Sequence, residues 1–236
     1  MKVFLYFFLC LNYVLGNTFV FNDLPEYKIG NIKLNKNNFV GLREVVNQQS
    51  VGKVIEGFSN IVNDDNGDKG MMLLLDTPGG SVIAGNNLID YLNYLNSTGI
   101  IVSCIAKKAI SMGFVILQQC PGKRLALPSS VLMQHQMSTM MMGNILNIEK
   151  DFNYSKNLYK KMLQKQSYRI GISSQDFLDK TRDDWWMDGE TALDNNVVDE
   201  LVNIGCSADL VKEKIVIAKE TIFGSTKKKV SRCPII

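Results

Sequence analysis

The sequence predicts an α/β fold in which parallel strands alternate with helices. Residues 71–76 and 100–105 are continuous apolar runs, typical of strands that flanking helices bury on both faces. Stretches with apolar residues at helical spacing precede the first run and separate the two. Because strand and helix keep alternating, we expect right-handed crossovers between parallel strands, with functional groups at the carboxyl ends of the strands.

The other elements are expected to continue this alternation. Strands are expected at 39–42, 125–127 and 131–133, a loop or strand at 184–189, and an apolar segment that closes the core at 197–202. Helices are expected at 51–62, 83–95, from Ser111 onward, at about 144–166, at 173–177 and at 191–194. Beyond Gly205 we expect an amphipathic helix around 210–217 and then a basic tail.

Length and composition indicate one globular domain. The chain has 236 residues, of which 46% are apolar and 21% charged, enough for one sizeable core. The net charge of +3 is modest, and the only basic run, at 227–229, is typical of a solvated tail rather than a nucleic-acid site. We therefore expect an N-terminal arm at 17–38, a domain at 39–205 and a C-terminal extension at 206–236.

The first sixteen residues predict a secretory signal peptide. A basic start precedes an apolar run that is too short to span a bilayer comfortably, and small or moderate residues follow up to Gly16. We expect cleavage after Gly16; an uncleaved N-terminal anchor or a buried strand is the alternative. This segment predicts the secretory pathway, the periplasm or an organelle rather than the cytoplasm. No other segment is long and apolar enough to cross a membrane.

Four cysteines remain once Cys10 leaves with the signal. An even number in a secreted protein permits disulfides, although a domain of this size does not need them. Cys104 and Cys120 lie in apolar runs, which favours buried free thiols. A pairing of Cys206 with Cys233 stays open.

Ser111 and His135 are the residues that predict chemistry. Ser111 lies in a tight small-residue setting after a strand, and His135, the only histidine, follows the apolar residues 131–133. A hydroxyl needs a neighbouring base to become a nucleophile, and histidine suits that task near neutral pH. A carboxylate should orient the imidazole. Spacing alone does not choose among five candidates: Asp183, Asp184, Asp188, Asp194 and Asp199.

A turn at 78–80 supplies candidate oxyanion donors. Pro-Gly-Gly after a buried strand suits a backbone that must approach another group closely. If the N–H groups of Gly80 and Met112 point to one spot, they form an oxyanion hole, aided by the dipole of the helix that starts after Ser111.

Several blocks of the sequence resemble the proteolytic subunit of the Clp protease family. They are LDTPGGSV at 75–82, AISMG at 109–113, GKRLALP at 122–128 and MQHQ at 133–136, with Asp199 after two valines, all in family order. The resemblance covers residues 71–202. It implies a Clp/crotonase-like fold of repeated ββα units with a mainly parallel sheet and a protruding helix at about 144–166.

The resemblance also assigns roles. It implies Ser111 as nucleophile, His135 as general base, Asp184 as orienting acid, and Gly80 and Met112 as oxyanion donors. The spacing from His135 fits Asp184 and not Asp183. The implied reaction is hydrolysis of peptide bonds in unfolded polypeptides or short peptides through an acyl-enzyme, with neither metal nor cofactor.

The resemblance implies partners as well. Family members assemble as stacked rings and receive unfolded chains from an ATP-driven unfoldase. This sequence has no Gly-x-x-x-x-Gly-Lys-Ser/Thr motif, so ATP would act only through such a partner. One segment departs from the family: residues 137–142 contain four methionines, where relatives have a proline and a Gly-rich stretch.

Two other interpretations are weighed against this one. A signal-peptide-peptidase-like membrane-associated protease of the same fold would use a Ser–Lys dyad, with Lys123 as the nearest candidate base. A catalytically inactive ring or scaffold subunit would be expected to lack a member of the Ser–His–Asp set, and none is missing. An acyl-CoA hydratase-like enzyme would not explain the three residues together.

Overall fold

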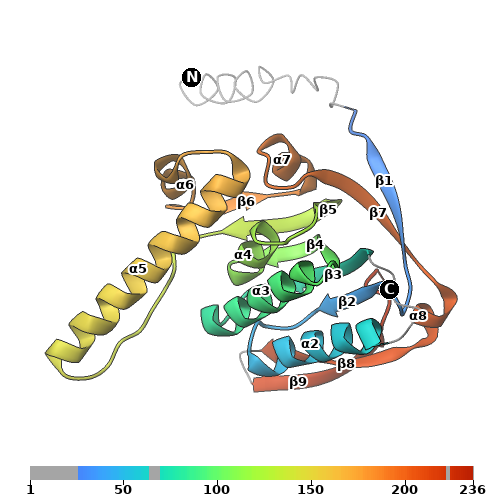
Figure 1. The fold of residues 1–236 in the computed structure, drawn as a ribbon, viewed down its shortest axis with the longest axis horizontal. Helices are drawn as coiled ribbons and strands as arrows, with labels where there is room; N and C mark the ends of the chain where they lie inside the picture. The colour runs from blue at the N-terminus through green and yellow to red at the C-terminus, as the bar shows by residue number, and fades with distance from the viewer. Residues whose placement is uncertain (1–25, 64–69, 222–223, 236) are drawn as a thin grey trace, which may run out of the picture.

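The computed structural model describes residues 26–63, 70–221 and 224–235. Its centre is a seven-stranded sheet in the order β1-β7-β5-β4-β3-β2, with β6 paired to β5 (Figure 1). All pairings in this sheet are parallel except the β5–β6 pairing. The strands are β1 (Ile29–Leu34), β2 (Phe39–Leu42), β3 (Gly70–Thr77), β4 (Ile101–Ile110), β5 (Arg124–Gln134), β6 (Trp185–Met187) and β7 (Glu200–Cys206).

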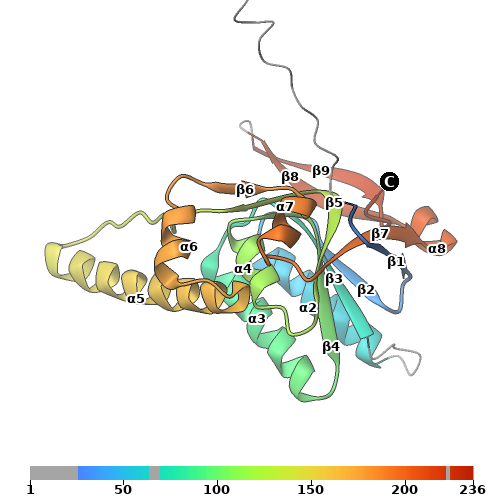
Figure 2. The same cartoon turned by 90° about the horizontal axis from the view of Figure 1, so that it is seen from above.

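Helices alternate with the central strands. They are α2 (Gln48–Asn63), α3 (Val82–Ser97), α4 (Met112–Gln118), α5 (Ile145–Ile170), α6 (Ser174–Lys180), α7 (Gly189–Asp194) and α8 (Ala208–Lys212). A hairpin of β8 (Lys214–Thr221) and β9 (Gly224–Ser231) follows α8. Figure 2 shows α2, α3 and α4 on one side of the sheet and the hairpin on the other. The predicted α/β class with a mainly parallel sheet is confirmed.

Burial on both faces explains the apolar strands. In β3, Leu73, Leu74 and Leu75 are all fully buried. Leu73 and Leu75 belong to the large core under α2, α3 and α4, whereas Leu74 belongs to a second core on the opposite face, with Leu210 of α8. Successive side chains of a strand point to opposite faces, so a strand between two cores needs an unbroken apolar run.

The two short strands expected at 125–127 and 131–133 form a single strand, β5. Both halves pair with β4: Arg124–Ala126 lie beside Cys104–Ala106, and Val131–Met133 beside Lys108–Ile110. The residues between them form an irregularity in the register, and the Ser130 hydroxyl donates to the Ala106 carbonyl at 2.6 Å. A common partner strand joins the two segments, which sequence periodicity does not reveal.

Both ends of the expected domain differ from the prediction. Part of the expected arm at 17–38 is β1, which pairs with β7 over its full length. The helix expected around 210–217 is wrong: α8 ends at Lys212, and β8 follows, with Ile215 and Ile217 half-buried and Val216 exposed. The basic run at 227–229 lies in β9 and is not a tail. The predicted signal peptide at 1–16 lies outside the described residues.

Cys104 and Cys120 are not the free thiols expected from their apolar neighbours. They form a disulfide, as do Cys206 and Cys233. The turn after α4 returns the chain to β4, where the Gly122 N–H donates to the Val102 carbonyl at 2.9 Å, and this return brings Cys120 beside Cys104. The second disulfide ties the end of β7 to the segment after β9.

Helix α5 extends away from the body of the molecule (Figures 1 and 2). Its buried residues all lie in its final third, from Met162 to Ile170. Ile145, Leu146 and Phe152, nearer its start, are exposed. Within the described ranges, no helix has the length and hydropathy needed to cross a membrane.

Candidate active site

Ser111 occupies a strained position between β4 and α4. Its φ of 55° and ψ of −116° lie outside the regions that residues with a side chain prefer. The Ser111 N–H donates to the Met133 carbonyl at 2.9 Å, and its carbonyl accepts from the Val115 N–H at 3.1 Å. Such strain costs about 1–3 kcal/mol and persists only where neighbours impose it. The hydrogen bonds to β5 and α4 do so here.

Gly79 lets the turn after β3 approach Ser111. Its φ is +89°, and a Cβ added there would lie 2.6 Å from the Ile110 carbonyl oxygen and 2.7 Å from the Ser111 Cβ. Both distances are far inside van der Waals contact, so only glycine fits. The turn and the serine therefore lie against each other, as the Pro-Gly-Gly sequence predicts.

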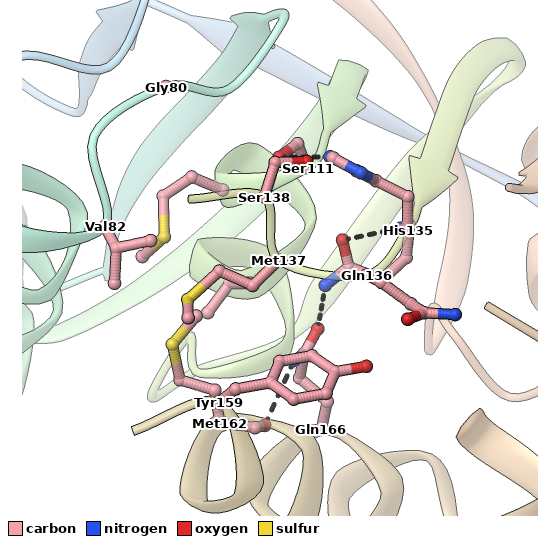
Figure 3. A pocket seen from close by; sticks show the side chains of 13 residues that line it. Gly80, Val82, Ser111, His135, Gln136, Met137, Ser138, Tyr159, Met162 and Gln166 are labelled. Carbon is pink, nitrogen blue, oxygen red and sulfur yellow. Dashed lines mark hydrogen bonds between the residues drawn. The ribbon is translucent and has the colours of Figure 1, made fainter. Parts of the chain in front are cut away.

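His135 directly follows β5 and faces the serine. The distance between its Nε2 and the Ser111 Oγ is 2.8 Å, a hydrogen bond (Figure 3). β4 and β5 are parallel neighbours, with Ile110 beside Met133, so their carboxyl ends bring together two residues that are 24 positions apart. The structure thus places the two residues in direct contact.

Asp184 is beside the histidine in the backbone register, but its carboxylate does not contact the imidazole. β6 runs antiparallel to β5 with Trp185 opposite Gln134, so the next pair outward is Asp184 and His135. Asp184 is exposed, has a φ of 52°, and forms no hydrogen bond to His135 among the described residues. The structure therefore brings together two of the three predicted residues and leaves the third adjacent.

Three of the other candidate carboxylates are occupied elsewhere. Asp188 accepts the Thr191 N–H at 2.8 Å as the N-cap of α7, and this hydrogen bond lowers its pKa. Asp194 accepts the Tyr27 hydroxyl at 2.8 Å, which raises the pKa of Tyr27 to about 12. Asp199 pairs with Arg124. Only Asp183 and Asp184 are left near the site, and both are exposed.

The two candidate oxyanion donors both line the cleft at Ser111. Gly80 has a φ of +143°, and the bonds on either side of it, from Val46 N–H to the Gly79 carbonyl and from Ser81 N–H to the Val46 carbonyl, hold the turn. Met112 is the first residue of α4, where a backbone N–H has no partner within the helix. In residues 70–221, neither N–H donates to a protein acceptor.

The cleft at Ser111 has a volume of about 190 Å³. Its wall combines the turn after β3, the start of α4, residues 134–138 and one side of α5. Figure 3 shows Tyr159, Met162 and Gln166 extending from α5 below Met137 and Gln136. Over the described parts of the chain, no group of three or more His, Cys, Asp or Glu side chains could hold a metal ion.

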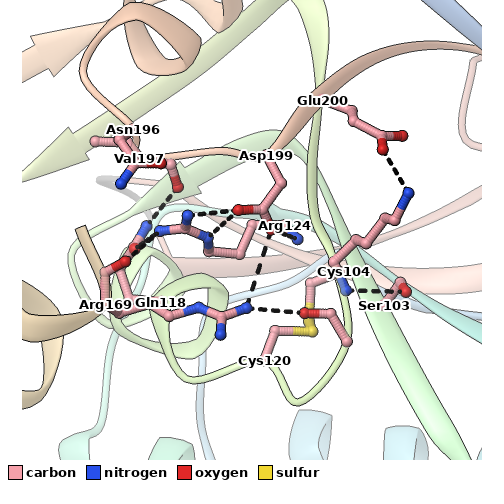
Figure 4. A network of polar contacts seen from close by, with 12 residues as sticks. Ser103, Cys104, Gln118, Cys120, Arg124, Arg169, Asn196, Val197, Asp199 and Glu200 are labelled. Carbon is pink, nitrogen blue, oxygen red and sulfur yellow. Dashed lines mark hydrogen bonds and ion pairs between the residues drawn. A yellow bond between two sulfur atoms is a disulfide. The ribbon is translucent and has the colours of Figure 1, made fainter. Parts of the chain in front are cut away.

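A polar network joins the end of α4 and the start of β5, the ends of these two elements that lie away from Ser111 and His135 (Figure 4). The buried Arg124 guanidinium donates to Gln118 at 2.8 Å and to Asp199 at 2.5 Å, and Gln118 donates to the Val197 carbonyl at 2.9 Å. Burial by itself acts to raise the pKa of the Asp199 carboxyl, but the hydrogen bonds and charge of Arg124 outweigh it and leave that pKa below its usual range. The network joins α4, β5 and the start of β7.

Lys123 lies in this region and not at the serine. Lys123 directly precedes β5, whereas His135 follows the last residue of that eleven-residue strand. The Lys123 ammonium pairs with Glu200. A strand of this length spans about 35 Å at 3.3 Å per residue. The Ser–Lys dyad is therefore wrong for Lys123.

Gln134, Gln166 and Arg124 are the site and supporting residues that sequence reasoning missed. Gln134 is next to His135 at the end of a strand, a position from which its role could have been suspected. Gln166 and Arg124 carry no local signal, because their partners lie far away in the sequence.

The fold and site together define a class: an α/β protein with a serine–histidine pair at the carboxyl edge of a parallel sheet, beside a strained turn. A family model described as Clp protease matches residues 26–205, about three quarters of the sequence. The chain belongs to the Clp protease family.

Two curated relatives are similar over part of their length. The ATP-dependent Clp protease proteolytic subunit 3 of Streptomyces avermitilis and subunit 1 of Streptomyces coelicolor are each 27% identical over 136 residues. The similarity covers 57% of this chain and 61% of each relative, so the chain spans less than two thirds of their length.

Proposed function

We propose that this protein is a serine endopeptidase that cleaves unfolded polypeptides or short peptides. The observation that carries the proposal is the 2.8 Å contact between the Ser111 Oγ and the His135 Nε2 at the edge of the sheet. A serine hydroxyl in hydrogen-bond contact with an imidazole is the arrangement that nucleophilic catalysis requires.

The proposed reaction has two steps. The Ser111 Oγ attacks the scissile carbonyl carbon while the His135 Nε2 accepts the hydroxyl proton. The C–N bond breaks, the proton passes to the departing amine, and an ester to Ser111 remains. Water, deprotonated by His135, then attacks the ester carbonyl. The bond to the Ser111 Oγ breaks, His135 returns the proton to this oxygen, and the acid is released. Apart from water and substrate, every reacting group belongs to the chain.

Backbone donors and a carboxylate complete the proposed site. The N–H groups of Gly80 and Met112 would donate to the oxyanion of the tetrahedral intermediates, and their lack of acceptors within the described ranges supports this role. Asp184 would orient the imidazole and stabilise its charged form. Its place beside His135 in the register supports the assignment.

We also propose assembly into rings. Five apolar side chains of the loop before α5 and the start of that helix are exposed: Met140, Met142, Ile145, Leu146 and Phe152. Several large apolar side chains exposed along one segment are uncommon on monomers and typical of interfaces. The relatives' names describe ATP-dependent proteolytic subunits, and ATP would reach this chain through a separate unfoldase. The predicted signal would take the assembly to the secretory pathway, the periplasm or an organelle.

Fluorophosphonate labelling tests the activity. The full chain should be labelled on Ser111, and labelling should disappear in Ser111→Ala and in His135→Ala, with Ser129→Ala, an exposed serine of β5, as a control that keeps it. The oligomer size of each sample would be measured in parallel. A well-folded, ring-forming wild type that takes no label would instead identify a scaffold subunit.

A further inference from the structure

Two buried glutamines form the inner wall of the cleft at Ser111. Gln134, at the end of β5, is 5% exposed, and Gln166, from α5, is 2% exposed. The Gln134 Nε2 donates to the Gln166 Oε1. Buried amides at such a place are costly unless their hydrogen-bonding groups find partners, so this pair gives the inner wall of the cleft a polar character.

The orientations of both amides are determined by backbone groups. The Gln134 Oε1 accepts the His135 N–H at 3.1 Å, and the Gln166 Nε2 donates to the Met162 carbonyl at 3.0 Å (Figure 3). Each amide nitrogen carries two hydrogens and uses one of them for these contacts. Among the described residues, one N–H of each glutamine therefore has no acceptor.

Tyr159 lies beside this pair on the same wall. Its hydroxyl oxygen is buried and has no hydrogen-bond partner among the described residues. Burial raises the pKa of Tyr159, and the Thr181 side chain acts against this shift. Because the hydroxyl oxygen has almost no accessible surface, Tyr159 lines the cleft through its other atoms and supplies no donor to it.

The rest of the lining holds no Asp, Glu, Lys or Arg residue. Val82, Met112, Val115 and Met162 contribute apolar walls, and Ser111, Gln136 and Ser138 add neutral polar groups. A charged substrate side chain would lose its hydration here without meeting an opposite charge, which is unfavourable. A purely apolar side chain would leave the free amide N–H groups unused.

We propose that this cleft receives the substrate side chain on the acyl side of the scissile bond and selects a neutral side chain with an apolar stem and a hydrogen-bond acceptor at its tip, glutamine being the simplest. The proposal rests on the proposed peptidase function. Gln134 and Gln166 would donate to the substrate amide oxygen through their free N–H groups. A site built to hydrogen-bond a substrate discriminates against analogues that lack the acceptor, because its own polar groups then stay unpaired.

Three peptides of similar side-chain size test this selectivity. They carry glutamine, methionine or glutamate before the scissile bond and are otherwise identical. For the wild type, kcat/KM should be about tenfold higher for glutamine than for methionine, the ratio that one net hydrogen bond supports, and lowest for glutamate.

Matched variants assign the effect to the wall. The double variant Gln134→Leu with Gln166→Leu removes both the donor and the acceptor of the hydrogen bond between the two amides. Neither amide is then left buried without the other. The double variant should lose the glutamine preference, measured as the ratio of kcat/KM for the glutamine peptide to kcat/KM for the methionine peptide. Gln164→Leu, an exposed glutamine of α5 outside the cleft, should leave it unchanged.

The outcomes separate the two proposals. If Ser111 takes the probe and the methionine peptide is cleaved as fast as the glutamine peptide, the selectivity proposal is overturned while the peptidase proposal stands. If the assembled wild type neither takes the probe nor cleaves any peptide, the peptidase proposal fails first. Should the double variant fail to fold, the wild-type ratios decide the question.

Discussion

The two ends of the α4–β5 unit have opposite characters. At one end, Arg124, Gln118 and Asp199 form a dense hydrogen-bonded network, and the Cys104–Cys120 disulfide lies beside it. At the other end, Ser111 is strained, Asp184 has a positive φ, and the N–H groups of Gly80 and Met112 have no acceptor in the part of the chain that the structure describes. One end satisfies its polar groups, whereas the other leaves them available.

This difference indicates how the site is held. Strain at Ser111 has to be imposed by surroundings that do not relax, and a network and a disulfide at the far end of the same helix and strand provide such surroundings. The unpaired donors at the near end are the groups that a reacting substrate would use. The comparison separates residues that stabilise the fold from residues that carry the proposed chemistry, and each prediction below tests that separation.

The largest effect is expected from replacing the nucleophile. Ser111→Gly should lower peptide hydrolysis by roughly 10⁴-fold or more and stabilise the fold by about 1 kcal/mol, because glycine relieves the strained φ but gains chain entropy in the unfolded state. Ser111→Ala should lose the same activity without gaining the stability. Urea unfolding and peptide hydrolysis measure the two quantities. Equal stabilities of the two variants would argue against strain at this position.

A smaller effect is expected at the orienting carboxylate. Asp184→Asn should lower kcat by roughly 10³- to 10⁴-fold, because the imidazole loses the charge that holds its tautomer. Its stability should hardly change, since asparagine also tolerates a positive φ. Asp183→Asn, at the neighbouring exposed carboxylate, is the control and should keep full activity. Similar losses in both variants would contradict the assignment.

The network end should show the reverse pattern. Asp199→Asn leaves the buried Arg124 charge without its anionic partner, so the free energy of unfolding should fall by about 3 kcal/mol. Activity per folded molecule should stay within about threefold of the wild type. Glu200→Gln, which removes the exposed pairing with Lys123, should cost less than about 1 kcal/mol. Chemical denaturation measures both variants.

The smallest effect is expected on the free energy of unfolding at acid pH. Because the pKa of Asp199 is lowered in the folded protein, its carboxylate stabilises the fold fully above the ordinary unfolded value of about 3.9. This contribution is lost as the pH falls through the lower folded pKa. The difference in unfolding free energy between the wild type and Asp199→Asn should therefore shrink below about pH 4. A difference in unfolding free energy that stays constant down to pH 3 would contradict this prediction.

The strands and helices of the centre could be predicted from local pattern because each has a period or an apolar run of its own. The C-terminal hairpin could not: the apolar spacing at 210–217 suits a helix as well as a strand, and the pairing of β8 with β9 decides between them. The Cys104–Cys120 disulfide was missed for a related reason. Cys104 and Cys120 look like core residues, and only the return of the chain after α4 places their sulfurs together.

The sequence by itself determined the α/β class, the strand-turn-helix setting of Ser111 and the candidacy of His135, because these follow from short stretches with their own residue types and spacing. Tertiary structure alone decided that the two side chains meet, that Arg124 pairs with Asp199, and that Gln134 meets Gln166 across the cleft. Contacts between residues far apart in the chain depend on which strands become neighbours and in which register. No local pattern specifies that choice, since it results from the packing of the whole sheet.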